Sequence, residues 1–146
     1  MKSSPTLLAI VLVLSSLVHS PATAADAVEP SLYRRLGGEP VMTRVVEQMI
    51  DSVAQDPKVN QSFEGVNLQK LEAKIVTHVC VLADGGCHYT GDGMKLAHEG
   101  MNIGQREFYA MVEALRVALD ANGVGEREKN ELLRLLAPMK RDVVSR

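Results

Sequence analysis

The chain has 146 residues, 23% of which are charged, and a formal net charge of −2. This length suits one domain and no more. The slightly acidic balance excludes the strongly basic surface that binds nucleic acid or an anionic membrane, so we expect neither as a partner.

The first 24 residues have the pattern of a secretory signal peptide. Lys2 gives a positive start, residues 7–17 are an apolar run, and residues 22–24 (Ala-Thr-Ala) form a small-residue cleavage site. The apolar run is too short for a permanent membrane helix. We therefore expect residues 1–24 to be removed and residues 25–146 to form a periplasmic or secreted domain without a membrane span. The mature histidines are His78, His88 and His98.

The mature chain is helical in pattern. Apolar residues recur at helical spacing over residues 41–53, 68–82, 108–119 and 132–143, and no alternating strand pattern or internal repeat is visible. Turn residues predict the breaks between helices, and Pro138 predicts a bend or an end within the last segment. The predicted breaks are Gly37-Gly38, Asp56-Pro57, Gly85-Gly86 and Asn122-Gly123. The sequence thus predicts a single all-α domain.

Cys80 and Cys87 are an even pair in a chain with an export signal, which favours a disulfide bond. Such a short loop would stabilise the fold by roughly 2–3 kcal/mol in the chain-entropy account. Together with His78 and His88 the cysteines also offer the ligand types of a structural zinc site. Residues two apart on a helix point in different directions, however, so the spacing favours the disulfide.

The most informative stretch is Tyr89-Thr90-Gly91, followed by Met94-Lys95, His98 and Gly100. It places His98 at the end of a short helical turn after a glycine pair. This run resembles the haem-ligating segment of group I truncated haemoglobins. The resemblance covers about residues 32–144, and it implies a two-over-two helical sandwich of the truncated globin type. Its other marks are Leu32-Tyr33-x-x-Leu36-Gly37-Gly38, Asp56-Pro57, Phe63-x-Gly65, Leu71 and Gly85-Gly86.

The resemblance implies that His98 binds haem iron from the proximal side and is the metal ligand. The haem is expected to be b-type, because the sequence has no C-x-x-C-H attachment motif. It also implies that Phe63 packs on the haem face and that Tyr89 or Lys95 meets a haem propionate. The cofactor-binding residues expected on this basis are His98, Phe63, Leu71, Tyr89, Met94, Lys95, Ile103 and Phe108.

The distal side departs from the family pattern. Ile50 stands where many members have tyrosine, and Leu71 and Ile75 stand where others have glutamine or another polar residue. Aliphatic side chains donate no hydrogen bond to bound dioxygen, so we expect faster dioxygen loss, easier iron oxidation or a preference for CO and NO. Lys74 is expected to line the pocket with its stem while its ammonium reaches water or a propionate. His78 is expected to face outward or toward the disulfide loop.

The resemblance implies a haem protein that reversibly binds dioxygen or another diatomic gas, for transport or sensing, with an unidentified reductase as partner. NO dioxygenase-type activity is a further reading, but the aliphatic distal side favours non-enzymatic binding. A six-coordinate haem protein for electron transfer or redox sensing, with Lys74 or His78 opposite His98, is the alternative. A helical interaction module would instead fail to take up haem.

Overall fold

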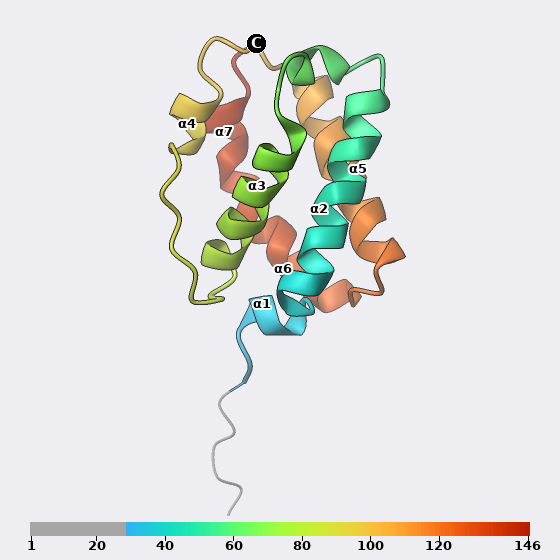
Figure 1. Cartoon of the computed structure of the whole chain (residues 1–146), viewed down its shortest axis with the longest axis vertical. Helices are drawn as coiled ribbons and strands as arrows, with labels where there is room; N and C mark the ends of the chain where they lie inside the picture. The colour runs from blue at the N-terminus through green and yellow to red at the C-terminus, as the bar shows by residue number, and fades with distance from the viewer. Residues whose placement is uncertain (1–28) are drawn as a thin grey trace, which may run out of the picture.

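A computed structural model describes residues 29–146, so the predicted signal peptide lies outside the described residues (Figure 1). Within this range the chain forms helices and no strand, which confirms the all-α prediction. None of the helices in this range is long and apolar enough to cross a membrane. The elements are α1 (Leu32–Arg35), α2 (Gly38–Gln55), η1 (Asn60–Phe63), α3 (Leu68–Leu82), α4 (Met94–Ala97), α5 (Gln105–Ala121), α6 (Glu126–Leu136), η2 (Ala137–Met139) and α7 (Lys140–Val143).

The helix ends follow the turn residues in the sequence. Gly37 (φ 97°) and Gly38 (φ 66°) take left-handed conformations between α1 and α2, which glycine adopts without a steric cost. Asp56 has extended angles after the last residue of α2, as the residue before Pro57 requires. At the end of α3 the first left-handed residue is Asp84 (φ 57°) rather than Gly85. The predicted break is therefore in the right place, but Asp84 and Gly86 make the turn.

The core is built around α2, which packs against both α3 and α5. In Figure 1, α2 (cyan to green) runs beside α3 (green) and α5 (orange). Its buried side chains repeat at helical spacing and meet apolar residues of α5 and α6. The α2 residues are Met42, Val45, Val46, Met49, Ile50 and Val53. Each buried side chain of this size stabilises the fold by about 1.5–3 kcal/mol.

The C-terminal helical segment bends where Pro138 predicts. Regular α-helix ends at Leu136, a 3-10 turn follows over η2, and α7 continues the chain. Near the start of α6, Lys129 is almost fully buried, at 2% exposure, and its ammonium donates to Asp120 and Glu126. The hydrogen bonds to these two carboxylates raise the pKa of Lys129. This ion cluster joins the end of α5 to α6 and was not predicted from the sequence.

The short helix α4 lies outside the core. It packs on α7, as Figure 1 shows, and it contributes no buried residue. Residues 83–93, which connect α3 to α4, form no helix or strand. This connection and α4 carry Cys87, Tyr89, Met94 and Lys95, and His98 directly follows them.

Candidate functional site

His98 directly follows α4 and is the C-cap of that helix, as the sequence predicts. Its ring nitrogen Nδ1 lies 2.7 Å from the backbone carbonyl oxygen of Met94, one turn earlier. A carbonyl oxygen only accepts hydrogen bonds, so Nδ1 carries a proton, and in the neutral ring Nε2 has the lone pair. The hydrogen bond therefore fixes both the tautomer and the orientation that an imidazole needs to coordinate a metal through Nε2.

A first group of predicted residues lies on η1 and α3. Phe63, Leu71 and Ile75 pack against the core cluster that includes the fully buried Ile50, but all three keep part of their surface exposed. Lys74, on the same helix, is exposed. The half-buried apolar side chains offer surface that a flat apolar cofactor would cover.

The remaining predicted residues form a separate group around the His98 segment. Tyr89, Met94 and Phe108 are half-buried, Ile103 is buried and Lys95 is exposed. None of them belongs to the core cluster around α2. The structure thus gathers the predicted residues into two sets, one on the core side and one along residues 89–108.

Within the Tyr-Thr-Gly motif, the Tyr89 side chain makes both a hydrogen bond and an aromatic contact. Its hydroxyl donates to the carbonyl oxygen of Asp92 at 3.3 Å, and its ring lies edge-on to the ring of His78 with centroids 5.0 Å apart. A Cβ added at Gly91 would overlap the Tyr89 hydroxyl. Gly91 has no side chain, which leaves the space that the end of the Tyr89 side chain occupies.

The His78 ring packs against Tyr89, two residues beyond Cys87 of the disulfide. Both of its ring nitrogens are buried and have no hydrogen-bond partner among the described residues. Burial lowers the pKa of His78, which favours the neutral imidazole. A buried polar group without a hydrogen-bond partner lowers the stability of the fold by about 1–3 kcal/mol, so the burial of the His78 ring is energetically unfavourable.

Cys80 and Cys87 lie at disulfide-bonding distance, with their Cα atoms 5.7 Å apart. This agrees with the predicted disulfide. A bond between the two sulfurs occupies both cysteines, which removes the thiolates that the zinc alternative needs.

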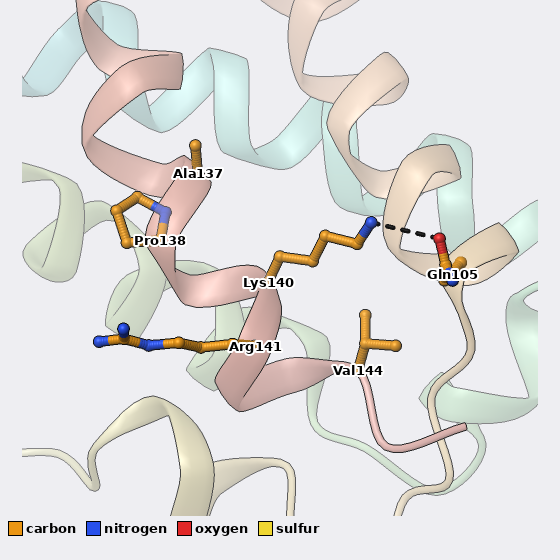
Figure 2. Close-up of a pocket in the computed structure, with 6 residues that line it drawn as sticks. All are labelled: Gln105, Ala137, Pro138, Lys140, Arg141 and Val144. Carbon is orange, nitrogen blue, oxygen red and sulfur yellow. Dashed lines mark hydrogen bonds between the residues drawn. The ribbon is translucent and has the colours of Figure 1, made fainter.

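The structure has surface hollows away from these residues. One of about 390 Å³ lies between the start of α5 and the C-terminal helices (Figure 2). There the ammonium of Lys140 donates to Gln105 at 3.2 Å and to the Tyr109 hydroxyl at 2.8 Å. Another, of about 400 Å³, adjoins Lys58 and Arg146. Neither hollow is lined by a residue predicted to bind the cofactor.

The donor set fits haem better than a bare metal ion. In residues 29–146 no group of three or more His, Cys, Asp or Glu side chains is arranged to hold a metal. Haem needs only one protein ligand, because the porphyrin supplies four nitrogens itself. A single oriented imidazole beside half-buried apolar side chains fits that requirement.

Comparisons with known proteins show the family to which the chain belongs. The family of bacterial-like globins matches residues 31–145. Group 1 truncated hemoglobin GlbN from Mycolicibacterium paratuberculosis is 31% identical over 115 residues, covering 79% of this chain and 85% of that protein. Group 1 truncated hemoglobin from Tetrahymena thermophila is 26% identical over 118 residues, covering 81% and 98%.

Solved structures show the same fold. The truncated hemoglobin from Tetrahymena pyriformis in its Fe(III) form has a TM-score of 0.76 and 27% identity, covering 80% of this chain and 100% of that one. The 2/2 hemoglobin from Synechococcus sp. PCC 7002 has a TM-score of 0.74 at 24% identity, covering 80% and 100%. The predicted two-over-two helical architecture is therefore confirmed.

Proposed function

Because the chain belongs to the bacterial-like globin family and is a group I truncated haemoglobin, we propose that it binds a diatomic gas at a b-type haem held by His98. Family membership implies haem-based gas binding. The observation that carries the residue assignment is the Nδ1 contact of His98 with the Met94 carbonyl, which leaves Nε2 free to coordinate.

Bound haem would supply an iron with one coordination position left for a gas. The chain's own residues then set how that position behaves. His98 would hold the iron through Nε2, and its hydrogen bond to the Met94 carbonyl fixes the orientation of the ring. Phe63, Leu71 and Ile75 provide apolar surface that excludes water.

The proposed distal residues Ile50, Leu71 and Ile75 carry no hydrogen-bond donor. They give a polarised ligand such as dioxygen no local stabilisation, whereas CO and NO depend less on such donors. Lys74 is exposed, which supports its role as a solvated lysine that reaches water or a propionate. We therefore propose reversible gas binding rather than tight dioxygen storage.

The predicted signal peptide supports a role outside the cytoplasm, in the periplasm or the extracellular medium. A reductase would then be needed to keep the iron ferrous in that compartment.

Haem titration of His98→Ala tests the proposal. We expect the variant to lose the Soret spectrum of the wild type while it retains most of its helical circular dichroism, because His98 lies outside the core. His88→Ala is the matched control, since His88 is exposed in the same connection. An unchanged haem spectrum in His98→Ala would refute the assignment.

A six-coordinate haem protein for electron transfer is the second candidate, and one observation favours His78 over Lys74 as its internal ligand. His78 is a neutral imidazole with both nitrogens buried and unpaired, whereas Lys74 is exposed. A low-spin ferrous spectrum that becomes high-spin in His78→Leu would support this candidate.

A further inference from the structure

The two groups of predicted haem residues are connected by residues 83–93. The first group belongs to η1 and α3, which pack on α2, and the second includes α4, which packs on α7. Within residues 29–146, α3 and α4 have no comparable packing against each other. The position of the His98 segment therefore depends on how residues 83–93 are attached to α3.

The start of the connection is fixed tightly to the end of α3. The amide of Gly85 donates to the Cys80 carbonyl at 2.7 Å, and the amide of Tyr33 donates to the Ala83 carbonyl at 2.8 Å. A Cβ at Gly85 would lie 2.5 Å from the Cys80 sulfur and 2.6 Å from the Tyr33 ring. The chain therefore turns back along α3 at Gly85, where the packing leaves no room for a larger residue.

Two side-chain pairs then hold the returning chain against α3. The first pair is the disulfide between Cys80 and Cys87. The second pair is the contact between His78, two residues before Cys80, and Tyr89, two residues after Cys87. The disulfide thus sets the register in which Tyr89 covers the His78 ring. Figure 1 shows this connection running back along α3 to reach α4.

Tyr89 is itself held in one orientation. Its hydroxyl is bonded to Asp92, and Gly91 leaves the space that its ring occupies. Helix α4 then begins directly after Gly93, whose carbonyl accepts the amide of Ala97. A short, constrained path thus leads from Tyr89 to His98.

We propose that the Cys80–Cys87 disulfide and the Tyr89–His78 contact act as a clasp that positions the His98 segment and slows the loss of haem. The inference rests on the proposed haem binding through His98. The four residues of the clasp are positioning residues, since they act through the placement of His98.

The clasp makes haem retention sensitive to dithiol reductants. Cys87 is exposed while Cys80 is fully buried, so an incoming thiolate attacks the sulfur of Cys87 and Cys80 leaves as a thiolate. The second thiolate of the reductant then breaks the mixed disulfide, which leaves an oxidised reductant and, after uptake of two protons, two cysteine thiols. The returning chain then lacks its covalent attachment to α3.

The test is the rate of haem transfer from the ferric protein to excess apomyoglobin. We expect Cys80→Ser/Cys87→Ser to release haem roughly tenfold faster than wild type, and wild type treated with dithiothreitol to do the same until it is reoxidised. Tyr89→Ala should release haem roughly 2- to 12-fold faster, which is the range that aromatic pair energies imply. Tyr89→Phe keeps the edge contact with His78 but loses the hydroxyl bond to Asp92, so its haem release should be slower than that of Tyr89→Ala.

The controls separate the clasp from general destabilisation and from the proposed function. Val53→Ala weakens the α2 core without touching the clasp, and its haem release should stay within about twofold of wild type. Wild-type release from both Tyr89→Ala and the double serine variant would overturn the clasp while leaving haem binding intact. Failure of the wild type to bind haem would instead refute the proposed function. Should the serine variant not fold, the Tyr89→Ala and Tyr89→Phe pair decides.

Discussion

In α2 six side chains are buried against neighbouring helices, whereas α4 contributes none and the connection before it has no regular structure. The α2 core is held by apolar burial that the chain provides for itself. The His98 segment is held by a disulfide, one aromatic contact, a few hydrogen bonds and packing on α7. The globin scaffold and the haem-ligating segment therefore depend on different interactions. Bound haem should stabilise the haem-ligating segment more than the scaffold.

The largest contrast is expected between a core variant and a ligand variant of the haem-free protein. Leu119→Ala removes a fully buried side chain and should lower the free energy of unfolding by about 2–5 kcal/mol. His98→Ala should change it by less than about 0.5 kcal/mol, because His98 lies outside the core. Urea unfolding followed by circular dichroism measures both, and equal losses would break the distinction between the two regions.

A smaller effect is expected where the two regions join. Gly85→Ala places a methyl group against the Cys80 sulfur and the Tyr33 ring, and it should cost about 1–3 kcal/mol of unfolding free energy. Gly93→Ala is the matched control, because no heavy atom outside its chain neighbours lies within 4 Å of the added Cβ. If both variants lost the same stability, the tight turn at Gly85 would not be the cause.

The buried imidazole predicts a pH dependence. Burial lowers the pKa of His78 in the folded state below its unfolded value of 6.5, so the unfolded chain binds more protons as the pH falls below 6.5. Stability should therefore fall with decreasing pH by at most about 1.4 kcal/mol per pH unit from this group. His78→Leu should reduce that slope in urea unfolding between pH 7 and pH 5. Identical slopes in variant and wild type would contradict the burial of a neutral ring.

The smallest effect in free energy concerns the gas. Leu71→Gln introduces a donor at a half-buried position of α3 and should slow dioxygen dissociation roughly 2- to 12-fold, the range expected for one added hydrogen bond. Stopped-flow mixing of the dioxygen complex with excess CO measures the rate. Ala73→Gln, at an exposed position of the same helix, is the control. Equal rates in all three proteins would place Leu71 away from the ligand.

Much of the fold could be predicted from local signals. The helical spacing of the α2 residues, the extended residue before Pro57 and the bend at Pro138 all depend on short-range sterics and periodicity. The position of His98 at the end of a helical turn was predictable for the same reason, and its bond to Met94 follows from their spacing of four residues.

The interactions that were missed are long-range or depend on shape. Nothing local in the sequence indicates that Tyr89 meets His78, although both flank the cysteine pair at equal spacing. The burial of Lys129 between Asp120 and Glu126 contradicts the usual exposure of lysine. At the end of α3 the left-handed conformation is taken by Asp84 and not by Gly85, which instead lies close to Cys80. This close approach depends on the folded shape, so residue type alone does not predict it.

The most direct test of haem binding through His98 with an open gas site is the visible absorption spectrum of the ferrous protein before and after addition of CO. We expect a five-coordinate high-spin spectrum that converts at once to a six-coordinate CO complex. A six-coordinate low-spin ferrous spectrum that yields only slowly to CO would contradict the open site and point to an internal ligand such as His78.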